Sequence, residues 1–525
     1  MENRVHKFSA RIIPAQLWWL VALSAIFRGF LAWWLELGND EVYYWTYALF
    51  PDLSHFDHPP MVGWMIQLFS LNLLFDNELF LRLSSVVLMS ANTITVFHIG
   101  RMLRNLRTGL IAAFLYNTSI YAFVITGIFI LPDTPQNFFW LLALLTLIRL
   151  SDCQPDRPGF VRLWLWFGLL AGFAMLSKYT SVFLWVGAAF FTLFYRRDWL
   201  RTPWPWAAAL ISFVVFTPVI IWNIQNGFIS FSFHGGRVTP QSGIRLDYFF
   251  TELAGQWLYN NPINVWLSWA ALLAIFRRRV FADTNSVRVL MFTAMPPILL
   301  FLAISFFRAT LPHWTGPAYV SLIPLAAARI EARTQKPLIP RSISAAGVLL
   351  LLVVLSGAVH IKFGLLQVGK EQPYHRLGKD DPGLDMFGYR DLLPAFSQIR
   401  QKHAEAGTIE LEAGLAGENW FPLANYDYYI ARPLGIKAFG IGQPERLHKY
   451  LWINRERGGL RLGADYWYIT NSRDYKHPAQ VFDGLFADII TADTVTINRS
   501  GKPAKRHFVF ILKNLQQLPP DPLAK

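Results

Sequence analysis

The stretch 205-PWAAALISFVVFTPVIIWN-223 contains no charged side chain. The hydrocarbon core of a bilayer is about 30 Å thick, and roughly 20 apolar residues in an α-helix cross it. The stretch therefore predicts a membrane-spanning helix. Similar runs recur up to His360 and give about eleven predicted spans, at 14–35, 79–100, 109–131, 134–150, 161–177, 180–195, 205–223, 258–276, 287–306, 314–330 and 342–361.

The composition of the 525 residues agrees with a chain that is solvated largely by lipid. Hydrophobic residues make up 54% and charged residues only 16%, whereas a soluble domain carries roughly 25% charged residues. This balance excludes disordered, collagen-like and small disulfide-stapled proteins. The single cysteine, Cys153, excludes an intramolecular disulfide and a cysteine-cluster metal site.

Basic residues gather in every second loop between the predicted spans. Because Lys and Arg are retained in short cytoplasmic loops, these loops are predicted to face the cytoplasm. The net charge of +14 is then mainly an orientation signal, and we expect no nucleic acid as a partner. The residues are Arg4, Lys7, Arg11, Arg101, Arg104, Arg107, Arg149, Arg157, Arg162, Arg196, Arg197, Arg201, Arg277, Arg278, Arg279, Arg288, Arg329, Arg333, Lys336 and Arg341.

The composition changes near Lys362, where charged residues, glycine and proline begin to interrupt short strand-like runs. We expect a membrane domain at 1–361 and a mixed α/β domain at 362–525 on the non-cytoplasmic side. The fold class is therefore an all-α polytopic membrane protein with a small C-terminal soluble α/β domain. The predicted elements of that domain are strands at 408–415, 425–431, 464–470 and 507–515, and a helix at 394–406 with Pro394 in its first turn.

Carboxylates occur in the loops on the side opposite the basic ones. Asp40 and Glu41 lie where the first span leaves the bilayer, directly before an aromatic segment. Partial burial of a carboxylate raises its proton affinity, which suits a general base. Asp133 lies between two prolines at the start of a predicted helix. For Asp40 and Asp133, capping of a helix N-terminus is the structural alternative.

Cationic side chains lie near the same face. Lys178 and Arg82 fall within a turn or two of the predicted interface, and Arg28 lies inside the first span. A charge in the bilayer costs at least ~2.5–3.5 kcal/mol and usually has a partner. We expect these side chains to bind an anionic ligand, above all a lipid phosphate at headgroup depth. The alternatives are snorkelling to the headgroups and, for Arg28, pairing with one of the carboxylates named above.

Histidines raise the question of a metal. His55, Asp57 and His58, together with Glu41, have side chains that suit a divalent cation, so such a cofactor stays open. His58, which precedes two prolines, could equally fix a rigid loop through one hydrogen bond. His313 is either part of an interfacial anchor or a substrate contact. The sequence contains no Walker, Rossmann or zincin motif, so nothing supports a soluble nucleotide ligand.

Five motifs in this order resemble the signature positions of bacterial polytopic glycosyltransferases with the GT-C fold. They are 39-NDEVYYW-45, 56-FDHPP-60, 131-LPDTP-135, 176-LSKYT-180 and 312-PHW-314. This superfamily includes protein O-mannosyltransferases, the lipid A aminoarabinose transferase and the lipopolysaccharide-core galacturonosyltransferases. The resemblance covers roughly residues 14–330, and the tail after Lys362 resembles their periplasmic domain more loosely.

The resemblance implies transfer of a sugar from a polyprenyl monophosphate donor to an acceptor hydroxyl, with inversion at the anomeric carbon. It implies Asp40 as the base and Asp133 as a second acidic position that orients the acceptor or supports the site. Lys178 and Arg82 become candidate ligands of the donor phosphate. The predicted substrate-site residues are Glu41, Tyr44, His58 and His313.

The sequence departs from the superfamily pattern at two motifs. Arg82 is followed by Leu83–Ser84–Ser85, where the pattern has a proline at the third place. Thr315–Gly316–Pro317 stands where Pro-Ala-Pro is more usual, which puts the contact role of that loop in question. Metal dependence differs across the superfamily and is not carried over.

The leading hypothesis is a polyprenyl-phosphate-sugar-dependent glycosyltransferase of a bacterial inner membrane that acts toward the periplasm on lipid A, core saccharide or another envelope glycan. Its partners would be a polyprenyl-phosphate-linked sugar, a glycolipid or glycan acceptor, and membrane lipids. Protein O-glycosylation is the alternative within the enzyme class. A transporter or lipid flippase, whose charged residues would line a path through the bilayer, and a non-catalytic binding protein of the same fold are the alternatives outside it.

Overall fold

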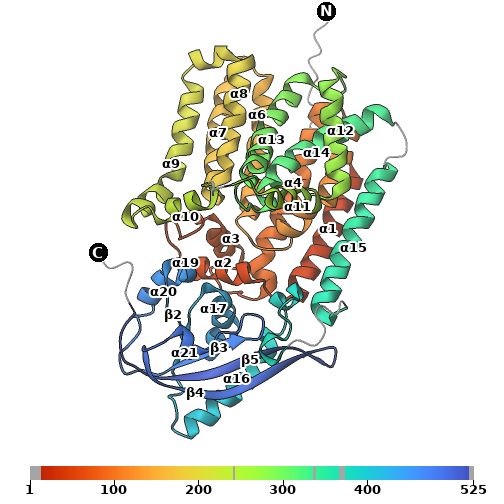
Figure 1. Cartoon of the computed structure of the whole chain (residues 1–525). Coiled ribbons are helices and arrows are strands. Elements are labelled where there is room, and N and C mark those ends of the chain that lie inside the picture. The colour runs from red at the N-terminus through yellow and green to blue at the C-terminus, as the bar shows by residue number, and fades with distance from the viewer. Residues whose placement is uncertain (1–13, 240–242, 335–338, 366–372, 520–525) are drawn as a thin grey trace, which may run out of the picture.

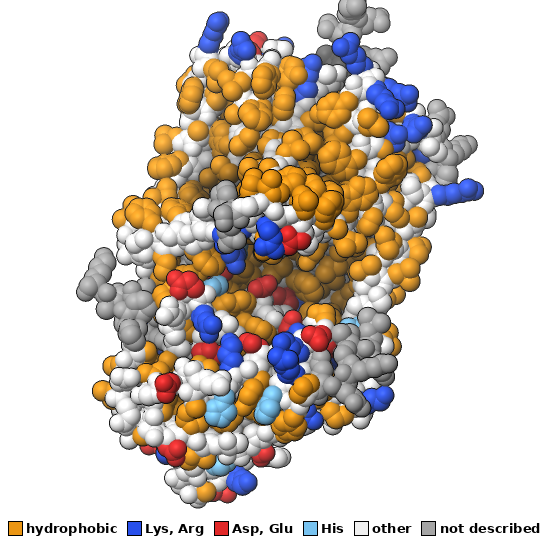
Figure 2. Space-filling model, viewed as in Figure 1, with side chains coloured by type: hydrophobic (Ala, Val, Ile, Leu, Met, Phe, Trp, Pro, Cys, Tyr) orange, Lys and Arg blue, Asp and Glu red, His pale blue; other side chains and the backbone are white. Residues whose placement is uncertain are grey.

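A computed structural model of the chain describes residues 14–239, 243–334, 339–365 and 373–519. A bundle of long helices occupies one end of the molecule and a β-sheet occupies the other (Figure 1). The basic residues Arg4, Lys7, Arg11 and Lys336 lie outside the described ranges. The other basic loop residues gather at the end of the bundle opposite the sheet, as Figure 2 shows for one face.

Within the described ranges, six helices are long and apolar enough to cross a membrane, so the chain is a multi-pass membrane protein. These six are α1 (Ala15–Trp34), α4 (Glu78–Leu103), α7 (Pro158–Ser177), α9 (Trp204–Gln225), α13 (Thr284–Ser305) and α15 (Arg341–Phe363). The bundle also contains α5 (Leu106–Thr118), α6 (Asp133–Ser151), α8 (Phe183–Tyr195), α11 (Leu246–Tyr259), α12 (Pro262–Phe276) and α14 (Gly316–Arg333). Nearly all of α14 is buried, which places it at the centre of the bundle.

Two of the predicted spans are interrupted. In the span predicted at 109–131, α5 ends at Thr118 and a π-helical turn, η1 (Tyr121–Ile125), follows. Polar side chains near that break bond to the backbone, and such bonds compete with the helix. The span predicted at 258–276 breaks at Asn261, which has φ 65° and whose side chain caps α12. Local side-chain to backbone bonds thus override apolar periodicity.

Shorter helices fill the space between the bundle and the sheet (Figure 1). They are α2 (Asn39–Leu49), α3 (Met61–Phe69) and α10 (Ile229–Val238). The remaining short turns are η2 (Tyr179–Val182), η3 (Arg197–Arg201), η4 (Pro312–Thr315), η5 (Tyr374–Arg376), η6 (Pro382–Met386) and η7 (Asp427–Ala431).

The C-terminal region contains one five-stranded sheet with the order β2-β1-β3-β5-β4. The strands are β1 (Gly414–Gly417), β2 (Ala438–Gly440), β3 (Tyr466–Asn471), β4 (Phe486–Arg499) and β5 (Lys502–Leu515). β1 runs parallel to β2 and β3, whereas β5 runs antiparallel to β3 and β4. The helices of this region are α16 (Tyr389–Glu405), α17 (Trp420–Tyr426), α18 (Arg432–Leu434), α19 (Pro444–Leu447), α20 (Tyr450–Glu456) and α21 (Pro478–Val481).

The predictions for this region had mixed outcomes. The strands predicted at 464–470 and 507–515 are confirmed as β3 and part of β5, but only the end of 408–415 is strand. The strand predicted at 425–431 is wrong, because this buried aromatic segment forms the end of α17 and η7. A short apolar run does not by itself distinguish a strand from a buried helix.

Two further details of the C-terminal region differ from the prediction. The helix predicted at 394–406 begins earlier, at Tyr389, so Pro394 lies inside it and not in its first turn. The long strand β4 was not predicted. It forms a hairpin with β5 through Ser500 and Gly501, which both have positive φ angles, as a two-residue turn between twisted strands requires.

Candidate active site

The junction between α1 and α2 carries the two acidic residues singled out in the sequence. α2 begins at Asn39, so Asp40 and Glu41 occupy its first turn, where the helix dipole favours negative charge. The Glu41 carboxylate accepts a hydrogen bond from the Gly38 N–H at 2.8 Å. The C-terminal region holds the same junction, because Glu36 accepts hydrogen bonds from the N–H groups of Gly388 and Tyr389. These hydrogen bonds fix the backbone that carries Asp40.

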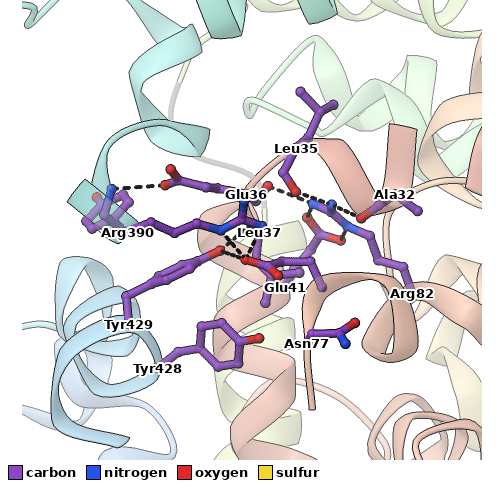
Figure 3. A network of polar contacts seen from close by, with 12 residues as sticks. Ala32, Leu35, Glu36, Leu37, Glu41, Asn77, Arg82, Arg390, Tyr428 and Tyr429 are labelled. Atoms are coloured by element: carbon purple, nitrogen blue, oxygen red, sulfur yellow. Dashed lines mark hydrogen bonds and ion pairs between the residues drawn. The ribbon is translucent and has the colours of Figure 1, made fainter. Parts of the chain in front are cut away.

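Glu41 and Arg82 form a buried ion pair (Figure 3). Arg82 donates to Glu41 Oε1 at 2.7 Å and to Oε2 at 2.6 Å, and it also donates to the backbone carbonyls of Ala32, Leu35 and Glu36. Arg82 is fully buried. Its guanidinium is saturated by protein acceptors and joins α4 to the end of α1. Arg82 therefore has no donor left for a donor phosphate, and Glu41 is bound to Arg82 and not free for a substrate, so both of these predictions are corrected.

Asp40 lies in a different environment from its neighbour. Its side chain is exposed, although protein surrounds it. Desolvation of the carboxylate by the surrounding protein, together with the negative charges of Asp57, Glu41 and Asp133, raises the pKa of Asp40 to about 6, and the charge of Lys178 acts in the opposite direction. Figure 2 shows a hollow between the helical region and the sheet in which acidic and basic side chains gather. An accessible carboxyl of this pKa can accept a proton near neutral pH.

Asp133 and Lys178 form a second buried ion pair. Asp133 is the first residue of α6, and Lys178 follows the last turn of α7. The Lys178 Nζ donates to Asp133 Oδ2 at 2.7 Å, and the Tyr121 hydroxyl donates to Oδ1 at 3.0 Å. An ammonium group carries three N–H donors, and Asp133 is its one hydrogen-bond partner among the described residues. Two donors therefore remain for an anionic ligand.

Gly316 explains one departure from the superfamily pattern. A Cβ atom at this position would lie 2.2 Å from Cε2 of Tyr121. The first residue of α14 must therefore be glycine for the Tyr121 ring to reach its place beside Asp133. The unusual Thr315–Gly316–Pro317 segment thus supports the Asp133 pair through Tyr121.

The loop between α2 and α3 adds Asp57 to the site. The hydroxyls of Tyr43 and Tyr47, one turn apart on α2, both donate to Asp57 Oδ1. Burial would raise the pKa of Asp57, but His58, His448 and the two tyrosines together lower it. Asp57 therefore stays ionised, and its charge contributes to the raised pKa of Asp40.

The C-terminal region supplies residues that the sequence reasoning missed. His448, between α19 and α20, lies with Nδ1 3.9 Å from Asp57 Oδ2 and stacks on Phe56. The next residue, Lys449, is buried and donates to His55 Nδ1 at 2.9 Å. Burial lowers the pKa of Lys449. His448 has a positive φ angle at the start of this contact, and no sequence motif predicts it.

The other predicted substrate-site residues also lie near the carboxylates. The Tyr44 ring packs edge-on against His58, with 5.8 Å between ring centroids. Burial lowers the pKa of His58 to about 3. Burial and the charge of Lys178 lower the pKa of His313 to about 4, although Asp133 acts in the opposite direction. Both imidazoles are therefore neutral at neutral pH.

A metal site of the kind considered in the sequence is not assembled. Within the part of the chain that the structure describes, no group of three His, Cys, Asp or Glu side chains is placed to hold an ion. Glu41 bonds to Arg82 and His55 bonds to Lys449. The residues present therefore do not fit a His–carboxylate metal centre.

Arg28 bonds to polar groups inside the bundle. It contacts Met89, Ser90 at 3.1 Å and Asn117 at 3.5 Å. The Arg28 guanidinium bonds to none of Asp40, Glu41 and Asp133 among the described residues, so that predicted pairing is not realised. Arg28 thus serves the packing of α1 against α4 and α5.

Comparisons with known proteins agree with this architecture. Residues 57–222 match the model of the family described as dolichyl-phosphate-mannose-protein mannosyltransferase. The structure resembles that of ArnT from Cupriavidus metallidurans bound to undecaprenyl phosphate, with a TM-score of 0.62 over 95% of this chain and 98% of that one, at 14% sequence identity. The same ArnT in the apo state gives a TM-score of 0.60 and 13% identity, over 94% of this chain and 97% of that one. The chain therefore shares the fold of ArnT over nearly its whole length, and residues 57–222 are similar to the family that this model describes.

The chain is also similar in sequence to a known glycosyltransferase. The chain is 24% identical over 307 residues to the lipid A galacturonosyltransferase RgtD of Rhizobium johnstonii. That match covers 56% of this chain and 63% of RgtD, which is less than two thirds of the relative's length.

Proposed function

We propose that the protein is an inverting glycosyltransferase that moves a sugar from a polyprenyl-phosphate donor to a hydroxyl of an envelope glycolipid. The observation that carries this proposal is the convergence of Asp40 with the Asp133–Lys178 pair at one end of the bundle. The fold shared with ArnT bound to undecaprenyl phosphate supports the donor class. The resemblance to RgtD, a lipid A galacturonosyltransferase, supports lipid A or core saccharide as the acceptor.

The proposed chemistry assigns a role to each charged group. Lys178 would bind the donor phosphate with its free N–H donors and stabilise the charge that develops on the phosphate as it leaves. Asp40 would accept the proton of the acceptor hydroxyl, whose oxygen forms the new bond to the anomeric carbon while the bond from that carbon to the phosphate oxygen breaks. Asp133 would hold Lys178 and orient the acceptor. This displacement inverts the anomeric carbon.

Neutral histidines and Tyr44 would complete the substrate site. His58 Nδ1 is buried and has no hydrogen-bond partner in the described part of the chain. A sugar hydroxyl could satisfy it, since an unpaired buried nitrogen is costly. His313, close enough to Asp133 and Lys178 to share their charges, would contact the donor side.

The membrane arrangement is part of the proposal. The basic end of the bundle would face the cytoplasm, and the hollow and the C-terminal region would face the periplasm. We propose about eleven membrane spans in residues 1–361 and a periplasmic domain at 362–525. A transporter or flippase would need charges along a path through the bilayer, whereas Asp40, Asp133 and Lys178 gather at one end.

Lipid analysis in a deletion strain tests the function. The strain is complemented with the wild-type chain, Asp40→Asn or Asp198→Asn, whose side chain is exposed at the basic end. We expect the wild type and Asp198→Asn to restore the sugar on lipid A or core, measured by mass spectrometry, and Asp40→Asn to leave it absent. Full restoration by Asp40→Asn would remove Asp40 from the mechanism.

Protein O-glycosylation is the second candidate, favoured by the match to a family described as protein mannosyltransferases. It predicts loss of Ser- and Thr-linked glycans in the deletion strain with unchanged lipid A and core. Glycoproteomics of the same strains distinguishes the two acceptors.

A further inference from the structure

A hollow at the opposite end of the bundle has the features of a second ligand site. It lies between α12 and α14 and has a volume of about 260 Å³. Its walls are apolar residues of α12, including Trp266, Trp269 and Leu273, and its rim carries three arginines, Arg277, Arg279 and Arg329. The mechanism proposed above uses none of these residues.

The three arginines are charged and unpaired. Among the residues that the structure describes, none of their side chains forms a hydrogen bond or an ion pair with the protein. Arg279 and Arg333 lie close enough to Arg329 for their positive charges to repel it. The nearby carboxylate of Glu331 is taken by Arg104 and Arg107. Packing like charges around a hollow is unfavourable unless an anion binds there.

The apolar wall extends from this rim along one face of α12. Trp266, Trp269 or Ala270, Leu273 and Arg277 follow one another at three- or four-residue steps, so they form a stripe on one side of the helix. Trp266 is 64% exposed and Leu273 is 50% exposed. At 1.5 Å per residue, the stripe from Trp266 to Arg277 is ~16 Å long, which is about half the thickness of a hydrocarbon core.

We propose that this hollow binds the phosphate of an anionic membrane phospholipid, with the acyl chains lying along the Trp266–Leu273 stripe. A guanidinium cluster matches a phosphate in charge and in hydrogen-bond geometry. Basic pockets between membrane helices on the cytoplasmic side are suited to anionic headgroups. The length of the stripe corresponds to one leaflet, which distinguishes a lipid from a free phosphate. The site would be a structural lipid site, separate from the donor site at the other end of α14.

Lipid binding to the purified full-length protein tests the proposal. The delipidated protein in detergent is mixed with phosphatidylglycerol, phosphatidylcholine or inorganic phosphate, and bound lipid is counted by native mass spectrometry while thermal unfolding is followed. We expect phosphatidylglycerol to remain bound and to raise the unfolding temperature, and the other two probes to do neither. Equal retention of phosphatidylcholine, or equal stabilisation by inorganic phosphate, would overturn the lipid assignment.

Two charge-matched variants locate the site. R277Q/R279Q/R329Q removes the arginines of the hollow, and R157Q/R162Q/R201Q removes three exposed arginines from the same end of the bundle. Neither set forms ion pairs in the described structure, so neither variant should unfold below the wild-type temperature without lipid. R277Q/R279Q/R329Q should unfold at or above that temperature, because it removes the repulsion between the arginines. The first should bind phosphatidylglycerol about 100-fold more weakly, because three arginines contribute roughly 1 kcal/mol each and about 1.4 kcal/mol corresponds to a factor of ten, and the second should bind nearly as the wild type does. Equal weakening in both variants would show general charge attraction and contradict a site at the hollow.

Discussion

The two buried ion pairs near α2 differ in what surrounds their cations. In the Glu41–Arg82 pair, five hydrogen bonds from the guanidinium end on protein acceptors, and both side chains are buried. In the Asp133–Lys178 pair, the ammonium keeps donors free and lies beside the exposed Asp40. A cation whose donors are all used holds helices together, whereas an ammonium group that keeps unused donors can bind an anionic ligand. Ion pairs of the same chemical type thus differ in whether the cation keeps donors for a further partner, and on this difference we base the proposed structural and catalytic roles.

Asp40→Asn is expected to have the largest effect on the reactive side of this comparison. Loss of the general base should lower the transfer rate by about 10²–10⁴-fold, measured with purified protein, lipid-linked sugar and acceptor. Stability should not fall, because a raised carboxyl pKa means that the ionised form is disfavoured in the folded protein at neutral pH. Asp198→Asn is the control. A variant that loses activity only because it unfolds would contradict the assignment.

Glu41→Gln tests whether the Glu41–Arg82 pair stabilises the fold. Removal of one member of a buried pair leaves Arg82 charged and uncompensated, so the free energy of unfolding should fall by about 3–5 kcal/mol. Thermal unfolding in detergent measures this loss, with Asp40→Asn as the neighbouring control. If Glu41→Gln unfolded at the wild-type temperature but had no transferase activity, Glu41 would belong to the chemistry.

Lys178→Gln tests whether the second pair contacts the donor. Loss of a charge that stabilises the leaving phosphate should lower kcat/KM by about 10²-fold. Lys178→Arg, which keeps the charge but changes its geometry, should recover part of that loss. Kinetics with varied donor concentration provide the measurement. Equal inactivity of both variants, with unchanged unfolding, would argue for a role that depends on lysine geometry and not on charge.

Gly316→Ala tests the packing behind Asp133. A Cβ atom 2.2 Å from the Tyr121 ring forces that ring to move, and overpacking of this kind costs about 1–3 kcal/mol. Gly347→Ala on α15 is the matched control, since its nearest contact would be an ordinary 3.8 Å to Thr118. We expect a lower unfolding temperature and reduced activity only for Gly316→Ala. Wild-type behaviour of this variant would show that the position of Tyr121 does not matter for the pair.

The pH dependence gives the smallest expected effect. Asp40 must be ionised to act as a base, and its pKa is raised to about 6. The value of kcat/KM should therefore rise with pH through about 6 and lie about tenfold below its plateau at pH 5. An ordinary aspartate would keep its activity down to about pH 4. A profile that stays flat to pH 5 would exclude Asp40 as the titrating base.

Much of the site could be predicted from sequence because its residues occur in ordered motifs at the ends of apolar runs. Asp40, Asp133 and Lys178 were selected in this way, and the structure brings them within range of one another's charges. Arg82 was selected by the same logic, but its partners come from α1 and α2, and no sequence pattern shows that its donors are all taken. His448 and Lys449 were missed because they reach the site from the C-terminal region through the fold alone.

The amino-acid sequence by itself determined that the chain is a membrane protein and that the loops with Asp40, Asp133 and Lys178 lie on the side opposite the basic loops. Both properties are local, because they depend on the length of apolar runs and on the charges of single loops. It did not determine where spans break, because Asn and Thr side chains bond to the backbone in ways that hydropathy ignores. Only the tertiary structure decided that Glu41 is buried in an ion pair with Arg82 while Asp40 stays accessible to solvent. Whether the donors of a cation are used depends on acceptors from distant parts of the chain. These acceptors come close to the cation only when the helices pack.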